Sequence, residues 1–513
     1  MENWNLSRGA HILRLYGAGA IDHLDPVSAH EPQARQITRL FSRQLFSYFP
    51  SPDPCSWKAI APVPDIARDV PSTYNAGLGA SHLSYVVHLR PGVFWDTDPP
   101  RAVTAQDVVR GFKRLGNPVS RPRNLTYLTS TIRGFARYCE EYAASLSGYE
   151  VTPDRLAAFQ NGHEIPGVFA LDDESLVIEL FRPALDAVNI LASACVAPAP
   201  VEYDAYIPDS AEFRQNIRST GPYRPVGYQR GTALVLERNP AWCPDSDPIR
   251  PAYADIIDIA VGAEPAEERI RTGAADLPWD VAAEASFIGC LPAGLDYLVF
   301  NFRRAAVQDR QLRRTVLTAV GTAGSIVPPG NDGHRANGLV PAAPRPVSFP
   351  SGLELTVAHL ATSAVSARPY QSLADAGVKV RRVAVPAAEY DAFLREGNWD
   401  IAALSRFPDW FHDNGRVFLQ PLLQSDSPDN FGRYASPRVD WLIGAALDSM
   451  IETGRARAAW RAAEQQALHD IAIIPFAYRS LAAPGPCGRR VSSAVPMPSI
   501  CGLYDLSGVS LTS

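Results

Sequence analysis

Lysine is nearly absent from this chain: Lys58, Lys113 and Lys379 are the only ones among its 513 residues. Covalent chemistry on a lysine amine is therefore not expected, although three lysines do not exclude it. The basic residues are almost all arginine, and the acidic residues outnumber them to give a net charge of −6. This charge gives no reason to expect nucleic acid or an anionic membrane as a partner.

Long apolar runs are also missing, since no apolar stretch of the sequence reaches the length that spans a bilayer. The amino-terminal stretch does not look like a secretory signal, because Arg14 interrupts its apolar part and no basic segment precedes it. Two locations follow as expectations. The protein is extracytoplasmic if a signal or lipoprotein leader was removed before Met1, and cytoplasmic if Met1 is the native start.

The seven cysteines form no recognisable motif, since they are an odd number, widely spaced, without a CxxC or CxH pattern. The spacing therefore does not suggest a zinc site or a redox pair. We expect scattered free thiols, which are typical of a reducing compartment, and neither a metal nor a cofactor.

Catalytic signatures are missing as well: there is no GxSxG, HExxH, Walker loop or complete GxGxxG. The "GAG" at 17–19 follows a predicted strand, but a turn rather than a helix comes after it. No residues are assigned a catalytic role, and we expect a binding protein rather than an enzyme.

What the chain does contain is a soluble composition, 46% hydrophobic and 20% charged, and enough length for two or three folded units. Residues 353–404 alternate strand and helix patterns as βαβαβ, which predicts a parallel sheet covered by helices. Thr104 is placed to cap a helix. The other main predicted elements are strands at 11–19, 84–95, 253–262 and 295–302, and helices at 33–49, 103–115, 309–321 and about 455–471.

Several segments, in order, resemble the family 5 extracellular solute-binding proteins, which include the peptide- and nickel-binding components of ABC transporters. The resemblance covers nearly the whole chain, and no single motif would be specific alone. The segments are "LRLYGAGAIDHLDP", "YVVHLRPGVFWDTDPPRAVTAQDVVRGFKR", "STGPYRPVGYQRGTALVLERNPAW", "IRTGAADL", "LVFNFRRAAVQDRQLRRTVLTAV", "YDAFLREGNWDIAAL", "SPRVDWLIGAA" and "IIPFAY".

The resemblance implies an α/β, two-lobed fold of the periplasmic-binding-protein kind (type II, cluster C-like), with a small inserted domain and a ligand cleft between the lobes. Lobe one would comprise residues 1–48, 168–262 and 483–513. The insertion would be 49–167, and lobe two 263–482. The βαβαβ pattern, found independently of the resemblance, falls inside lobe two.

The stretch "SRFPDWFHDN" (405–414) is the richest in chemistry. The resemblance implies that Ser405, Arg406 and Phe407 line the cleft, where backbone groups would pair with an extended ligand as an added strand does. It also places Asp409 where some peptide binders hold the α-ammonium of the ligand, with Trp410 beside it.

Three readings of Asp409 stay open at this point. It could anchor a ligand, it could be the amino-terminal carboxylate of a helix that Pro408 starts, or it could act as a metal ligand or acid/base group with His412 and Asp413. Pro408 makes the last of these the weakest, because both aspartates would have to share the face of an established helix.

Other ligand-binding candidates are His30 and Glu31 in "VSAHEP", and Asn301 and Arg303 at the end of the strand predicted at 295–302. Ordinary surface roles are open for all four. Some peptide binders carry an arginine for the ligand carboxylate near the position where this chain has Ala403, and Arg406 is the candidate replacement.

The sequence thus predicts a monomeric solute-binding protein that encloses a peptide or peptide-like molecule by hinge closure, for uptake through an ABC permease. No nucleic acid and no membrane span are expected. The alternative is an intracellular protein of the same fold that serves as an enzyme or carrier in the biosynthesis of a specialised metabolite.

Overall fold

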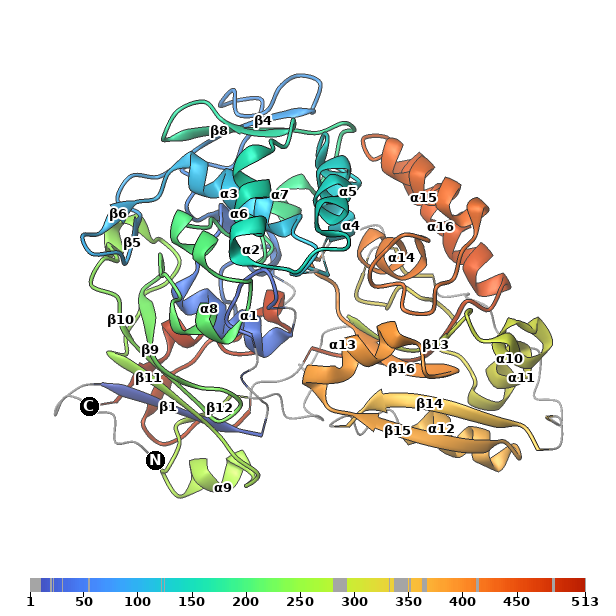
Figure 1. The fold of residues 1–513 in the computed structure, drawn as a ribbon. Coiled ribbons are helices and arrows are strands. Elements are labelled where there is room, and N and C mark those ends of the chain that lie inside the picture. Colours follow the sequence, from blue (N-terminus) through green and yellow to red (C-terminus); the bar gives the residue numbers. More distant parts are fainter. Residues whose placement is uncertain are drawn as a thin grey trace. The chain divides into compact units, whose positions relative to one another are not determined.

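The computed structural model describes residues 11–18, 21, 23–29, 31–53, 56–120, 122–123, 125–279, 293–331, 333–335, 349, 352–361, 367–411, 415–481 and 485–512. They form an α/β structure, as predicted, in two compact units (Figure 1). Unit 1 comprises Met1–Ala285 and Ala482–Ser513, and unit 2 comprises Ser286–Leu481. The predicted lobe boundaries and the inserted domain stay predictions.

The main sheet of unit 1 has the order β12-β1-β11-β10-β9. Strand β1 is parallel to both of its neighbours, β11 and β12, whereas β10 is antiparallel to both β11 and β9. Strands distant in the sequence are therefore neighbours in one sheet. The bounds are β1 Ile12–Gly17, β9 Tyr223–Gln229, β10 Ala233–Arg238, β11 Ile256–Val261 and β12 Leu277–Pro278.

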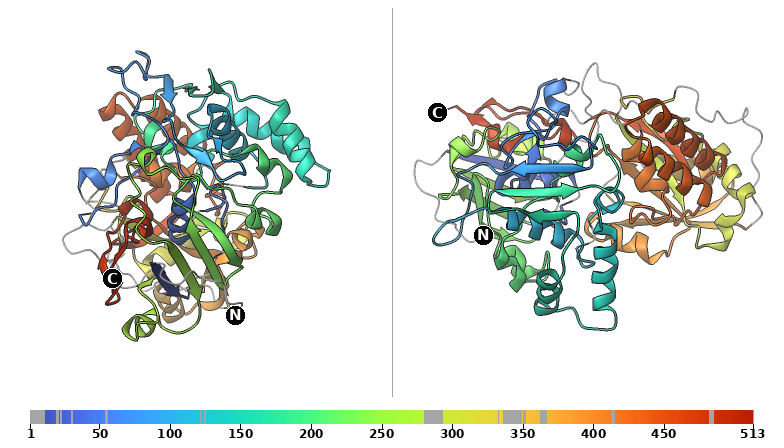
Figure 2. Two further views of the ribbon diagram at one scale, coloured as in Figure 1. Left: turned by 90° about the vertical axis from the view of Figure 1, so that its left-hand side faces the viewer. Right: turned by 90° about the horizontal axis from the view of Figure 1, so that it is seen from above.

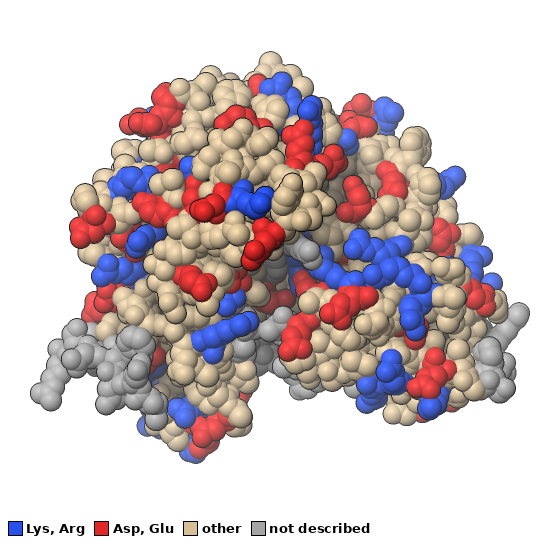
Figure 3. All heavy atoms as spheres, in the orientation of Figure 1, with Lys and Arg blue, Asp and Glu red and all other residues tan. Residues whose placement is uncertain are grey.

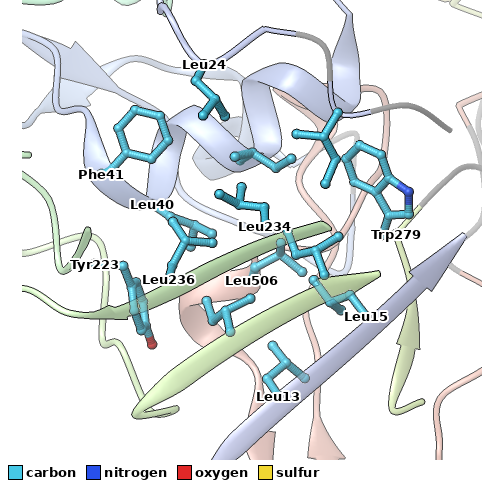
Figure 4. Packing of buried hydrophobic residues seen from close by; sticks show 14 of the residues in the cluster. Leu13, Leu15, Leu24, Leu40, Phe41, Tyr223, Leu234, Leu236, Trp279 and Leu506 are labelled. Atoms are coloured by element: carbon cyan, nitrogen blue, oxygen red, sulfur yellow. The ribbon is translucent and has the colours of Figure 1, made fainter. Parts of the chain in front are cut away.

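The core of unit 1 lies between this sheet and helix α1 (Pro32–Phe41). Figure 4 shows Leu40 and Phe41 of α1 close to Leu234 and Leu236 of β10. Leu506 joins the same cluster, so the carboxy-terminal segment of the chain completes a core that the amino-terminal strand begins. Burial of such side chains stabilises the unit by about 1.5–3 kcal/mol for each large residue.

The predicted helix at 33–49 is wrong in its second half, because α1 ends at Phe41 and Ser42 has extended backbone. Residues 46–47 pair with 63–64 as a short ladder. Apolar residues recur past the end of the helix because this strand is also buried, so helical periodicity alone misplaced the boundary.

The amino-terminal end of α3 (Ala105–Leu115) confirms the predicted cap. The Thr104 hydroxyl accepts a hydrogen bond from the Asp107 backbone N–H at 3.4 Å, and the Asp107 carboxylate accepts one from the Thr104 N–H at 2.9 Å. This reciprocal arrangement satisfies two amides that a helix terminus otherwise leaves without partners.

Among its described residues, unit 1 also contains a three-stranded sheet in the order β4-β8-β7, three two-stranded ladders and further helices. The strands are β2 Phe46–Ser47, β3 Val63–Pro64, β4 Ser84–His88, β5 Phe94–Trp95, β6 Arg101–Ala102, β7 Val168–Ala170, β8 Ser175–Glu179, β18 Val491–Ser493 and β19 Ser510–Leu511. The helices are α2 Trp57–Ile60, α4 Leu125–Thr129, α5 Phe135–Leu146, α6 Pro153–Gly162, α7 Ala187–Leu191, α8 Ala211–Gln215 and α9 Ala266–Arg271.

Unit 2 contains a sheet in the order β15-β14-β16-β13-β17. Its βαβαβ portion is confirmed, because β14 is parallel to both β15 and β16. The outer pair differs, since β13 is antiparallel to β16 and to β17. The bounds are β13 Gly294–Phe300, β14 Glu354–Leu360, β15 Lys379–Val385, β16 Ile401–Arg406 and β17 Ile473–Arg479.

Helices pack against this sheet, and residues of α11 and α12 share a buried cluster with β13, β14 and β16. Figure 2 shows α15 and α16 side by side. Within the described ranges, no helix combines the length and the apolar character that a bilayer crossing needs. The helices of unit 2 are α10 Ala305–Gln308, α11 Arg310–Val320, α12 Ala367–Asp375, α13 Ala387–Glu396, α14 Arg416–Leu423, α15 Pro437–Asp448 and α16 Thr453–His469.

Candidate ligand-binding site

The predicted ligand-binding stretch begins at the end of β16 in unit 2. Ser405 lies opposite Asp296 of β13, and Arg406 lies opposite Leu295. Because side chains alternate along a strand, Ser405 faces one side of the sheet and Arg406 the other. Phe407 then packs on Gly294, where an added Cβ would lie 2.6 Å from the ring, so the glycine permits this close approach.

The Arg406 guanidinium is the centre of a compact charged cluster. It donates to Oδ2 of Asp409 at 2.7 Å, to Oδ2 of Asp429 at 3.2 Å, and to the Val417 carbonyl at 2.8 Å. Arg406 and Asp429 are largely buried, and Asp409 is partly buried. The structure therefore brings the two predicted charged anchors together, and it pairs them with each other.

Asp409 and Asp429 thus both accept a hydrogen bond from this one guanidinium. Charge-assisted hydrogen bonds of this kind are strong when water is partly excluded. Arg406 ties the end of β16 to Val417 of α14, and the carboxylates of the cluster are acceptors that suit a cationic group. Trp410 is 2% exposed, so its ring packs largely inside the unit.

Asn301 and Arg303 lie at the other end of β13, away from this cluster. From Asp296 to Asn301 the strand rises about 17 Å, at about 3.3 Å per residue. Asn301 is fully buried, and its Nδ2 donates to the carbonyls of Gly397 (3.0 Å) and Trp399 (2.9 Å). The structure thus does not bring Asn301 together with the 405–410 stretch.

The Arg303 guanidinium binds the last turn of α13. It donates to the carbonyls of Arg395 at 2.9 Å and Leu394 at 3.3 Å, and to Oδ1 of Asn301 at 3.1 Å. A cation at the carboxy-terminal end of a helix is stabilised by the helix dipole. Contacts of Asn301 and Arg303 with a ligand stay predictions, beside these structural roles.

In unit 1, Glu31 directly precedes α1, and its exposed carboxylate pairs with Arg123 at 3.4 Å. His30 lies outside the described residues, as do His412 and Asp413, on which the metal reading of Asp409 depended. In the parts of the chain that the structure describes, no group of three or more His, Cys, Asp or Glu residues could hold a metal ion.

Sequence reasoning missed Asp296, a buried carboxylate in the apolar strand "GLDYLVF". Its Oδ1 accepts a hydrogen bond from the Ser405 hydroxyl at 2.5 Å and lies 3.7 Å from Nε of Arg479. Burial raises the pKa of Asp296, and the Ser405 hydrogen bond and Arg479 offset only part of that effect. An acid inside an otherwise hydrophobic strand was the signal that could have found it.

The sequence profile described as "Bacterial extracellular solute-binding proteins, family 5 Middle" matches residues 62–344, which is more than half of the chain. The chain belongs to this family. The family 5 resemblance seen in the sequence is therefore confirmed. A comparison with curated proteins gave no match.

Solved structures similar to this family 5 chain extend over almost all of it. The Escherichia coli murein tripeptide binding protein MppA has a TM-score of 0.77 at 18% identity, with 98% of this chain and 99% of that chain covered. The clavulanic acid biosynthesis oligopeptide binding protein 2 gives 0.74 at 19% identity, covering 98% and 95%. Haemophilus influenzae OppA in complex with RPPGFSPFR gives 0.75 at 15%, covering 98% and 99%. These likenesses confirm the predicted fold class.

Proposed function

We propose that this chain is a solute-binding protein that captures a peptide or peptide-like molecule and delivers it to an ABC-type permease. The observation that carries the proposal is family 5 membership combined with a fold likeness over 98% of the chain to proteins described as binding peptides. The two units would act as lobes that close on the ligand about a hinge. An extracytoplasmic location and a monomeric state belong to the same proposal.

The end of β16 would supply the contact with the ligand backbone. Beyond Arg406 the chain leaves the ladder with β13, and an extended ligand would pair with the backbone from Phe407 onward as an added strand. Pairing through main-chain groups gives affinity that does not depend on ligand sequence, while side-chain pockets add selectivity. Ser405 and Trp410 would flank this segment.

Asp409 would take the α-ammonium of the ligand. The hydrogen bond from Arg406 at 2.7 Å holds this carboxylate near the end of β16, where it can also accept a donor from the ligand. Partial burial strengthens that contact, because less water competes for the carboxylate. His30, Glu31, Asn301 and Arg303 complete the set of proposed contacts.

Isothermal titration of the full chain with di- to pentapeptides tests the proposal. Asp409→Asn should weaken binding roughly 10- to 150-fold, which corresponds to about 1.5–3 kcal/mol for a hydrogen bond to a charged group. The control is Asp426→Asn, an exposed carboxylate in the same unit, which should leave affinity unchanged.

Acetylating the peptide amino terminus should weaken binding to the wild type and have little further effect on Asp409→Asn. A lower melting temperature with unchanged affinity would assign Asp409 a purely structural role. Binding of no peptide at all would refute the proposed function itself.

A further inference from the structure

The start of β13 holds a buried negative charge that is only partly compensated. Asp296 is 1% exposed, and its Oδ1 receives the Ser405 hydroxyl. Its Oδ2 is buried and has no hydrogen-bond partner among the described residues. A buried carboxylate oxygen without a donor is costly, and native proteins rarely leave one in that state.

A second buried acceptor without a partner lies near the same end of the strand. Asn331 is 5% exposed, and its Nδ2 donates to the carbonyl of Ala293 at 3.1 Å and of Pro328 at 3.4 Å. These two carbonyls fix the orientation of the amide, and Oδ1 of Asn331 then has no donor in the described part of the chain. Ala293 directly precedes β13, three residues or about 10 Å along the chain from Asp296.

Arg479 does not donate a hydrogen bond to Oδ2 of Asp296. Arg479 lies on the neighbouring strand β17, where its Nε is 3.7 Å from Oδ1 of Asp296 and its Nη1 donates to the Ser405 hydroxyl at 3.4 Å. One contact is with Oδ1, and the other is with the Ser405 hydroxyl that donates to Oδ1.

Both unsatisfied atoms are acceptors, and one of them carries charge. A group that satisfies them must therefore be a donor, and a positively charged donor satisfies the carboxylate best. Ser405, in the stretch proposed to line the ligand, is hydrogen-bonded directly to Asp296, which places Asp296 beside the proposed binding segment.

We propose that Asp296 and Asn331 form a subsite in unit 2 for a cationic side chain of the ligand, a lysine ammonium or an arginine guanidinium. The subsite rests on the proposed function and deepens it, because it assigns a preference for basic peptides. Asp296 supplies the charge, and Asn331 supplies a neutral acceptor for another N–H of the ligand.

Titration of the full chain with matched peptides tests the subsite. The probes are alanine tripeptides and pentapeptides that carry one lysine or arginine at each position in turn. Each probe is compared with the same peptide carrying norleucine or citrulline, which keep the stem and remove the charge. The wild type should bind the charged member of at least one pair tenfold or more tightly. Asp296→Asn should remove that difference and leave the affinity for the neutral member unchanged.

The melting temperature of the ligand-free variant distinguishes the subsite from a purely structural role for Asp296. Asparagine keeps an oxygen for Ser405 and removes a poorly compensated buried charge, so the melting temperature of the ligand-free variant should be unchanged or higher. Asp426→Asn, the exposed control, should retain the full preference for the charged peptide. If Asp296→Asn does not fold, Asp296→Leu replaces it, with the same expected loss of preference.

The outcomes separate the two proposals. Peptide binding without a difference between charged and neutral members overturns the subsite and leaves the proposed function standing. A preference that survives in Asp296→Asn overturns it too, as does a lowered melting temperature with parallel loss of both affinities. Failure of every peptide to bind refutes the proposed function, and the subsite with it.

Discussion

Replacing Asp65 with asparagine should destabilise unit 1 more than replacing almost any exposed acid. The side chain is fully buried between two fully buried arginines. Its Oδ1 lies 2.8 Å from Nε of Arg43, and its Oδ2 lies 2.7 Å from Nη2 of Arg250. The network joins the segment after α1 to the turn at residues 247–250, and Asp247 is its second carboxylate.

The magnitude follows from the charge balance of the network. In the wild type two carboxylates face two guanidiniums, whereas Asp65→Asn leaves one buried guanidinium uncompensated. Removing one partner of a buried pair costs about 3–5 kcal/mol. Because asparagine keeps one oxygen for Arg43 or Arg250, we expect the lower end, about 3 kcal/mol at pH 7.

The same network sets the sign of a pH dependence. Burial alone raises the pKa of Asp65, but Arg250 and Arg43 outweigh it and hold the pKa well below its usual value of 3.8. A carboxyl with a depressed folded-state pKa contributes stability above its unfolded-state pKa, and that contribution is lost as the pH falls below it. The difference between wild type and Asp65→Asn should therefore shrink between pH 4 and pH 2.

Urea unfolding followed by circular dichroism and tryptophan fluorescence measures both effects. Asp69→Asn is the matched control, because Asp69 is exposed and its ion pair with Arg68 lies at the surface. It should change the unfolding free energy by no more than about 0.5 kcal/mol. A loss below about 1 kcal/mol for Asp65→Asn, or a difference that grows toward low pH, would refute the reasoning.

Two further changes test the architecture of unit 2. Gly294→Ala places a Cβ 2.6 Å from the Phe407 ring, so it should cost about 1–3 kcal/mol in urea unfolding, whereas Gly454→Ala has open space around the new Cβ and should be neutral or slightly stabilising. Asn301→Ala leaves two buried carbonyls without donors and should cost about 1–3 kcal/mol, while the exposed Asn398→Ala should cost much less. If a change and its own control have equal effects on the free energy of unfolding, the interpretation of that residue is wrong.

Much of the fold could be predicted from local pattern. The βαβαβ portion at 353–404 has strands and helices of distinct periodicity joined by short connections, and this combination specifies parallel pairing. The end of α1 at Phe41 could not be predicted in the same way. It depends on the ladder formed by residues 46–47 and 63–64, a contact distant in the sequence.

The candidate site was predictable only in part. The stretch 405–410 stands out by its residue types, but the pairing of Arg406 with Asp409 and Asp429 depends on how the chain turns after β16. Asn301 lies far along the sheet from Ser405 because β13 is antiparallel to β16, which puts the end of β13 beside the start of β16, and residue pattern does not determine the direction of a pairing. The burial and contacts of Asp296 depend on the neighbouring strands, which supply Ser405 and Arg479, and these contacts are distant in the sequence.

Native mass spectrometry of the gently purified full chain, followed by release and fragmentation of any bound molecule, tests the central claim most directly. The account predicts a co-purified peptide or peptide-like ligand that is released unchanged after incubation, and that is depleted in Asp409→Asn but not in Asp426→Asn. A bound molecule without amide bonds would contradict peptide binding. Conversion of the bound molecule to a new mass would instead support a catalytic role for the same fold.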